Sequence, residues 1–181
     1  NSTGGTIIGS SAGSSSTGST AIGSSVFSNK GGTAIGVGVN AGQRGLSIGK
    51  NISSSGQDAV SFGMTLTGSG QQTTNIGSGN QAQGKGSVVL GKSSSTGSSA
   101  LYALAIGLNA QATGKGSTAI GNRVIAAGQE SLNIGMSGQT TAGRYAFALG
   151  ASNIATGESS FAIGKSNTTA KNASAYGQLN Q

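Results

Sequence analysis

The chain has 181 residues, 35 of them glycine, no cysteine, histidine or proline, and a net charge of +7. The missing cysteines exclude disulfides and thiolate metal sites, and the missing histidines remove the commonest general base and metal ligand. The positive charge favours anionic partners such as sulfated glycans, nucleic acid or lipid head groups. No apolar run approaches the ~20 residues of a membrane-spanning helix.

Bulky apolar residues are scarce but regularly placed. Leucine, isoleucine, valine and phenylalanine number 33, about 18% of the chain. A fraction this low, in a chain rich in glycine and serine, is typical of disorder. Charged residues, however, make up only 7%, and the bulky residues recur in register. We therefore expect an ordered chain.

A segment of about 14 residues repeats from one end of the chain to the other. Each copy ends with an apolar side chain followed by a glycine, which we call the closing glycine. In chain order the closing glycines are Gly9, Gly23, Gly36, Gly49, Gly63, Gly77, Gly91, Gly107, Gly121, Gly135, Gly150, Gly164 and Gly177. Self-similarity at a short fixed period indicates a stacked-repeat architecture.

Each copy predicts two short β-strands. Before the closing glycine, bulky and small residues alternate with the period of two that is typical of a strand. A weaker strand follows the glycine, with residues such as Val39 and Ile52 three positions after it. Two strands and two turns describe one coil of a parallel β-roll, while the glycine density excludes a helix, at about 1 kcal/mol each. Thirteen coils spaced ~4.8 Å apart give a body about 60 Å long.

The turns of the roll are marked by glycine and by charge. A second glycine recurs seven residues before the closing one, and we predict that it supplies the positive φ of a turn. Its copies are Gly42, Gly56, Gly70, Gly84, Gly114, Gly128, Gly143 and Gly157. Every charged residue lies five or six positions before a closing glycine, or one or two after it. The two longest copies, around Ser98–Leu101 and Ser137–Gln139, are predicted to carry insertions in turns.

Such a short coil encloses a narrow interior, which the small residues two and four before the closing glycine and five after it fill. The large residues one and three before it are then expected to point outward as an apolar stripe. An exposed stripe of this length predicts self-association, and three rolls around an axis would bury it. The alternative is a monomeric solenoid with these side chains inside. The predicted trimer-core ladder is Ile8, Ile22, Ile35, Ile48, Phe62, Ile76, Leu90, Ile106, Ile120, Ile134, Leu149 and Ile163.

The segments STAIG, SVVLG, ALAIG and SSFAIG, with ATG or AQG beginning nine residues before the closing glycine, resemble the YadA-like head of trimeric autotransporter adhesins. The resemblance covers essentially the whole chain. It implies an all-β, left-handed parallel β-roll that is homotrimeric and is held out from a Gram-negative outer membrane. It also implies that the apolar ladder forms the trimer interior. We interpret residues 1–181 as a single head-repeat domain, a fragment of a longer surface protein whose neck, heptad stalk and membrane anchor lie elsewhere.

The resemblance implies a non-catalytic adhesin that binds extracellular matrix or cell-surface ligands and needs no cofactor. The expected partners are further copies of the chain, together with collagen, fibronectin, another matrix protein or sulfated glycans. Contact with a membrane is expected only through other parts of the full-length protein. The alternative function is a passive spacer that carries a separate adhesive domain. Nucleic acid is not expected, because only seven aromatic residues are present and Phe62 and Tyr176 fall on the stripe.

Motifs of enzymes are weak in this sequence. Gly86–Ser93 matches the phosphate-binding pattern GxxxxGK[ST], but it spans a predicted strand and no helix is expected after it. Asp58, Glu130 and Glu158 lie several coils apart, too far to act as an acid–base pair. A threonine ladder for ice binding is incomplete, since threonine occupies the third position before the closing glycine in five of thirteen copies. We therefore predict no catalytic, metal or cofactor site.

Overall fold

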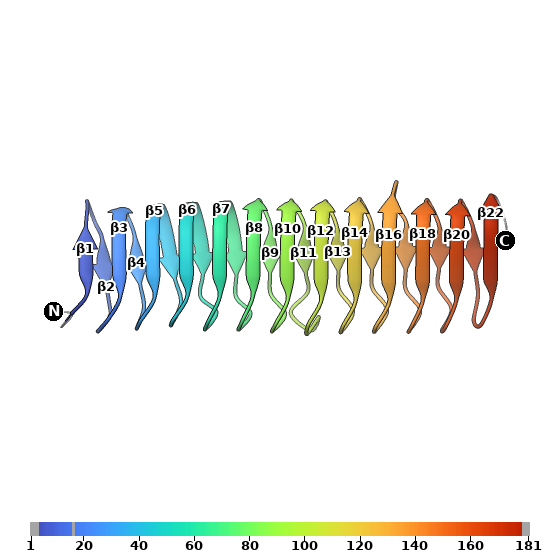
Figure 1. Cartoon of the computed structure of the whole chain (residues 1–181), viewed down its shortest axis with the longest axis horizontal. Coiled ribbons are helices and arrows are strands. Elements are labelled where there is room, and N and C mark those ends of the chain that lie inside the picture. The colour runs from blue at the N-terminus through green and yellow to red at the C-terminus, as the bar shows by residue number, and fades with distance from the viewer. Residues whose placement is uncertain (1–3, 16, 179–181) are drawn as a thin grey trace.

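The computed structural model describes residues 4–15 and 17–178, and these form a parallel β-solenoid with no helix among them (Figure 1). The coils follow one another along a straight axis, with the two ends of the chain at opposite ends of the body. The predicted all-β roll with coils of about 14 residues is confirmed. Residues 1–3, 16 and 179–181, which the predicted domain includes, lie outside the described residues.

The strand that contains each closing glycine, or in β1 ends just before it, forms one wall of the solenoid, which we call the long wall. Its strands are β1 (Thr6–Ile8), β3 (Thr20–Ser24), β5 (Thr33–Ala41), β6 (Leu46–Ser54), β7 (Val60–Gly68), β8 (Thr74–Ser78), β10 (Val88–Lys92), β12 (Leu104–Leu108), β14 (Thr118–Asn122), β16 (Leu132–Met136), β18 (Phe147–Ala151), β20 (Phe161–Lys165) and β22 (Ser174–Gln178).

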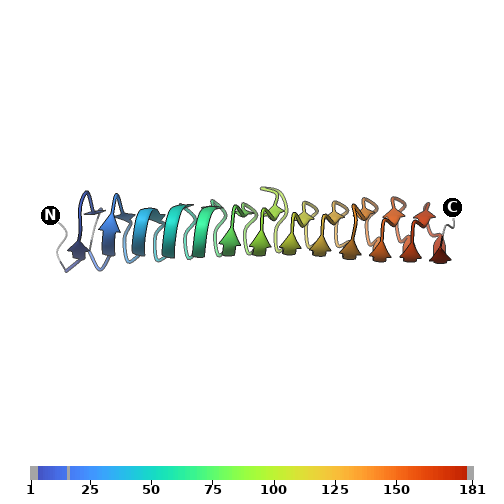
Figure 2. The ribbon, with the colours of Figure 1, turned by 90° about the horizontal axis from the view of Figure 1, so that it is seen from above.

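The opposite wall, the short wall, consists of two-residue strands (Figure 2). They are β2 (Gly13–Ser14), β4 (Phe27–Ser28), β9 (Gln81–Ala82), β11 (Ser95–Thr96), β13 (Gln111–Ala112), β15 (Ile125–Ala126), β17 (Thr140–Thr141), β19 (Ile154–Ala155) and β21 (Thr168–Thr169). Strands β5, β6 and β7 are continuous through the bend and contribute to both walls.

Each strand pairs in parallel with its equivalent in the next coil, and the register follows the repeat. In the pairing of β14 with β16, Ile120 lies beside Ile134 and Gly121 beside Gly135. The longer copies keep this register, because Gly91 still pairs with Gly107 across a 16-residue interval. The inserted residues are therefore accommodated outside the long-wall strands.

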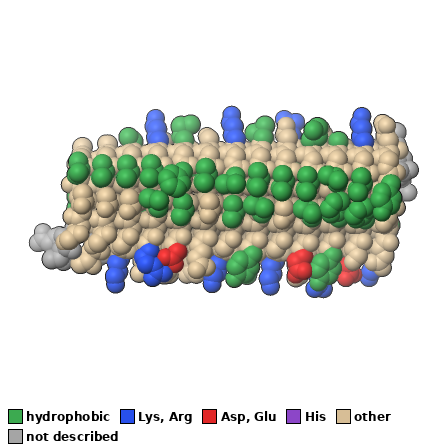
Figure 3. All heavy atoms as spheres, viewed as in Figure 1, with side chains coloured by type: hydrophobic (Ala, Val, Ile, Leu, Met, Phe, Trp, Pro, Cys, Tyr) green, Lys and Arg blue, Asp and Glu red, His purple; other side chains and the backbone are tan. Residues whose placement is uncertain are grey.

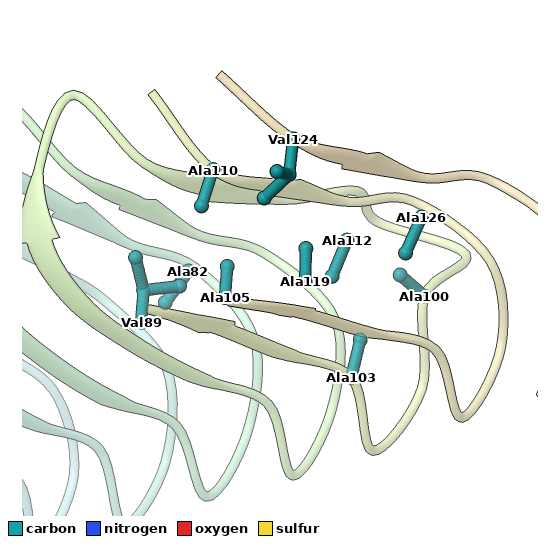
Figure 4. Close-up of a cluster of buried hydrophobic side chains, with 10 residues drawn as sticks. All are labelled: Ala82, Val89, Ala100, Ala103, Ala105, Ala110, Ala112, Ala119, Val124 and Ala126. Atoms are coloured by element: carbon teal, nitrogen blue, oxygen red, sulfur yellow. The ribbon is translucent and has the colours of Figure 1, made fainter. Parts of the chain in front are cut away.

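The interior is filled by the small residues of both walls. Ala105 and Ala119 from the long wall face Ala110, Ala112 and Val124 from the opposite side of the coil, all with at most 1% exposure (Figure 4). The prediction for the residues two and four before the closing glycine and five after it is therefore confirmed, except in the first coil, where Ile7 is exposed. Residues three after it are also buried, and they include the largest core side chains, Ile52 and Leu66.

Buried amides replace aliphatic side chains in several coils. Asn80, Asn153 and Asn167 occupy the position of Val124 and are fully buried. The side chain of Asn80 donates to the carbonyls of Ile76 and Gly91 at 2.8 and 3.0 Å and accepts from the amide of Ser94 at 3.0 Å. Because these bonds join one coil to the next, the amides satisfy backbone groups at the bend that would otherwise be buried without partners.

The predicted role of the second glycine row is wrong. Gly56, Gly128 and their equivalents do not have positive φ; the left-handed residues lie two positions later, where Arg44, Asp58 and Tyr102 adopt φ of 53–58°. Glycine is required at the predicted positions for a different reason. A Cβ placed on any of them would lie only 1.8–2.5 Å from a backbone atom of the following coil.

At the closing glycines both the backbone φ and the lack of space for a Cβ require glycine. Their φ lies between 100 and 153°, and from Gly9 to Gly164 a Cβ would lie 1.7–2.0 Å from the carbonyl oxygen of the next closing glycine. Real Cβ atoms do not approach a carbonyl so closely, so any other residue would force adjacent coils apart. Two glycine rows thus set the close stacking of the coils.

We predict that Gly121→Ala destabilises the fold by at least ~3 kcal/mol, lowering Tm by about 10 °C, because its Cβ meets backbone on the next coil. Gly18→Ala is the matched control. Gly18 also has positive φ, at 73°, but has no atom within 4 Å of its Cβ position. The free energy of unfolding should therefore fall by only about 1 kcal/mol in Gly18→Ala. Thermal melts followed by circular dichroism measure both, and equal Tm values for the two variants would contradict the stacking argument.

Candidate ligand-binding surfaces

The predicted trimer-core ladder lies on the outer side of the long wall, as expected. Each of its twelve residues stands outside the coil, and Ile8, Ile76 and Leu149 are 57, 40 and 37% exposed. The residues three before the closing glycine form a second row beside it, half-buried along most of its length. Together they make an apolar stripe that runs the length of the body (Figure 3). The alternative placement of these side chains inside the coil is therefore wrong.

The stripe becomes aromatic towards the C-terminus. The rings of Phe147 and Phe161 stack with centroids 4.7 Å apart, and the ring of Tyr176 lies 5.5 Å from that of Phe161. Tyr176 is 64% exposed in the single chain. These rings contact one another across coils and form a continuous aromatic part of the stripe.

All charged residues lie at the two bends between the walls. We call the residues one and two after the closing glycine the closing corner, and the residues five and six before it the opening corner. The closing corner carries Lys50, Lys92, Arg123 and Lys165 and no acidic residue. The opening corner carries Lys30, Arg44, Asp58, Lys85, Lys115, Glu130, Arg144, Glu158 and Lys171. Figure 3 shows basic side chains along both borders of the stripe and acidic ones along only one.

Acidic residues of the opening corner pair with bases on neighbouring coils. Arg44 donates from Nε and Nη2 to the two carboxylate oxygens of Asp58, both at 2.7 Å. Lys171 lies 3.3 Å from Glu158. These pairs compensate part of the opening corner's charge, whereas the closing corner has no acidic residue that could do the same.

The two insertions occur at different places on the surface. Residues 98–101 extend the turn between β11 and β12, and this turn projects in Figure 2. Tyr102, at its end, is 63% exposed and lies over Gly86 of the preceding coil. The predicted turn insertion is therefore confirmed for Ser98–Leu101, with Ala100 inside it turned inward and fully buried. Around Ser137–Gln139 the prediction holds for the first two residues only, because Gln139 turns inward and is fully buried.

The second insertion borders a shallow groove. Asn109, Gln111, Arg123, Ile125 and Gly138 line a hollow of about 330 Å³ where the closing corner meets the short wall. A larger hollow of about 500 Å³, lined by residues 168–170 and 173–176, lies at the last coil, which no further described coil covers. Sequence reasoning found the insertion but missed the groove, because two of its polar residues, Asn109 and Gln111, look like ordinary turn residues.

The weak enzyme motifs acquire no supporting geometry. Gly86–Ser93 is a turn followed by β10, and no helix follows it in the described chain. The three carboxylates stand on separate coils, and the described residues include no group of three or more potential metal-ligating side chains. Within the same residues there is no helix long and apolar enough to span a bilayer.

Comparison with protein-family models identifies the repeat. Residues 69–94, 98–123 and 142–167 match the model of the YadA head domain repeat (2 copies). No curated protein matches the chain. The matched segments each contain wall and corner elements described above; Ser98–Leu101 lies at the start of the second segment, whereas Ser137–Gln139 lies between the second and the third.

The Arg44–Asp58 pair predicts a local pH response. The hydrogen bonds from Arg44 hold the pKa of the Asp58 carboxyl below its usual value. A lowered pKa in the folded state stabilises the fold above the ordinary carboxyl pKa, and this contribution is lost as the pH falls through the lowered value. Arg44→Gln should therefore raise the pKa of Asp58, measured by NMR titration of its carboxyl carbon, while Arg123→Gln should leave it unchanged. Identical titrations of Asp58 in all three proteins would refute the coupling.

Proposed function

We propose that this chain, which contains a YadA-like head domain, is the non-catalytic binding head of a surface adhesin. The family to which its repeats belong implies a surface-exposed domain of a trimeric autotransporter adhesin. The observation that carries the proposal is the combination of matched head repeats with an uncovered apolar stripe along the whole body. The ligands we propose are collagen, fibronectin, another matrix protein or sulfated glycans, and the location is the Gram-negative outer membrane.

The proposed working form is a homotrimer of left-handed rolls with the long walls facing a common axis. Monomeric proteins rarely leave an apolar surface of this extent exposed to water. The charged residues all lie at the corners, so the stripe can be buried without desolvating a charge. The short wall and parts of both corners then face outward, and these surfaces are available to ligands.

Replacing Ile106, Ile120 and Ile134 together with Asp should dissociate or unfold the trimer. Each substitution would place an unpaired carboxylate in an apolar interface, at a cost of several kcal/mol. Ile154→Asp and Ile125→Asp are the matched controls, because both residues point outward from the short wall. Light-scattering mass and Tm report the result. A trimeric mass retained by the triple variant, or lost in the short-wall controls, would show that the long wall is not the interface.

A passive spacer is the second candidate, and the uniform straight stacking of the coils favours it. The two functions differ in what the head itself binds. Purified head protein should bind at least one of collagen, fibronectin or a sulfated glycan if it is adhesive, and none if it is only a spacer.

Deleting residues 108–121, one complete coil, separates the two functions in the full-length protein. The deletion shortens the body by ~4.8 Å, the spacing of adjacent strands, and keeps the register of the remaining coils. A spacer loses only this reach, so adhesion measured on whole cells should change little. An adhesive surface that includes the deleted coil should lose affinity. Absence of binding by the head to every ligand above would reject the adhesin function.

A further inference from the structure

The groove beside Gly138 brings together an inserted residue, an unpaired cation and amide side chains. In repeat proteins the conserved coil geometry builds the scaffold, and insertions map to loops that often belong to the binding face. The groove lies where the closing corner meets the short wall, off the outer side of the long wall that carries the apolar stripe. None of its lining residues belongs to the stripe, so covering the stripe does not itself occupy the groove.

The wall of the groove formed by the insertion is anchored from inside the coil. The buried side-chain amide of Gln139 donates to the carbonyls of Ile134 and Ala148 at 2.9 and 3.0 Å. Its oxygen accepts from Asn153 of the next coil at 3.0 Å. Because Gln139 fills the interior position, the extra residue is displaced outward as Gly138. The position of Gly138 is thus set by a satisfied buried network, and the groove is part of the fold.

The polar side chains of the groove lie on adjacent coils and point to the same side. The backbone N–H of Asn109 donates to the backbone carbonyl of Lys92, and that of Arg123 to the carbonyl of Leu108, both at 2.9 Å. These bonds place Asn109 and Arg123 on successive coils of the closing corner. Gln111 pairs in register with Ile125 on the short wall. The guanidinium of Arg123 has no hydrogen-bonding or ion-pairing partner among the described residues.

We propose that this groove binds a carboxylated sugar ring of a cell-surface or matrix glycan. Arg123 presents a planar fork that matches one carboxylate through two parallel hydrogen bonds. Asn109 and Gln111 each offer a donor and an acceptor to ring hydroxyls, and Ile125 offers an apolar contact for the C–H face. A hollow of about 330 Å³ is at the lower end of small-molecule sites, which matches one or two sugar rings.

Other occupants fit the groove less well. A peptide strand cannot add to the sheet here, because Gln111 already pairs with Ser95 on one side and Ile125 on the other. Sulfated chains favour several clustered bases, whereas the other bases of this corner nearest to Arg123, Lys92 and Lys165, lie two and three coils away. No acidic residue of the closing corner opposes a bound carboxylate.

The test is a titration of the assembled head followed by NMR or calorimetry, with 3′-sialyllactose and a glucuronic-acid oligosaccharide as carboxylated probes. Lactose is the neutral control, and a heparin fragment and an acidic peptide represent the other chemistries. We expect saturable binding of at least one carboxylated sugar and none of lactose. The sialylated and uronic-acid probes separate the two sources of a sugar carboxylate.

Variants test whether the groove is the site. Arg123→Gln should weaken binding at least ~10-fold, as expected for loss of a charge-assisted bidentate contact, and Arg123→Lys should also weaken it because the fork is lost. Lys165→Gln makes the same change of charge on the same corner and should alter affinity less than ~2-fold. Unchanged mass and Tm verify that the variants are folded.

Several outcomes would overturn the proposal: no binding of either carboxylated sugar, equal binding of lactose, binding only of the heparin fragment or the peptide, or equal losses in Arg123→Gln and Lys165→Gln. The inference rests on the proposed role as a binding head, but the two can fail separately. A head that binds collagen or fibronectin and neither carboxylated sugar remains an adhesin without this site.

Discussion

The fold depends on the close approach of successive backbones at two glycine positions in every coil. At the closing glycines a Cβ would lie within about 2.0 Å of the next carbonyl oxygen, and at the second glycine row the space is similarly small. At both bends, successive coils can therefore stack at the spacing of a β-sheet only if the two glycine positions carry no side chain. This constraint keeps each coil small, with one long wall and one short wall, and fixes the register of successive coils.

A narrow coil determines where large side chains can go. The interior admits alanine, serine and asparagine over most of its length, and residues as large as Ile52 and Leu66 only where β5, β6 and β7 curve continuously from one wall to the other. The isoleucines before the closing glycines do not fit inside and stand on the outer side of the long wall. The exposed stripe, and with it the proposed self-association, is thus a consequence of the glycine stacking.

The walls of the roll were predictable from the sequence because their signal is a period of two repeated thirteen times. The alternation around Ile120 and Gly121 determines which side chains face inward, and the register in the structure agrees. The function of the second glycine row was not predictable in the same way, since a turn and a close backbone contact both favour glycine. Only the coordinates show that the left-handed turn residues are Arg44, Asp58 and their equivalents.

The groove beside Gly138 illustrates a different limit of sequence reasoning. Its side chains come from two coils and its backbone wall, at Gly138, from a third, so no single repeat contains its pattern. The inward turn of Gln139 depends on Asn133 and Asn153, which lie in neighbouring positions of the interior and supply its hydrogen-bonding partners. A buried amide can replace an aliphatic core residue here because the adjacent bend leaves backbone carbonyls to be satisfied. Placing the amide of Gln139 in the interior, where other coils have an aliphatic residue, moves Gly138 to the surface. This displacement distinguishes this part of the roll from the other coils.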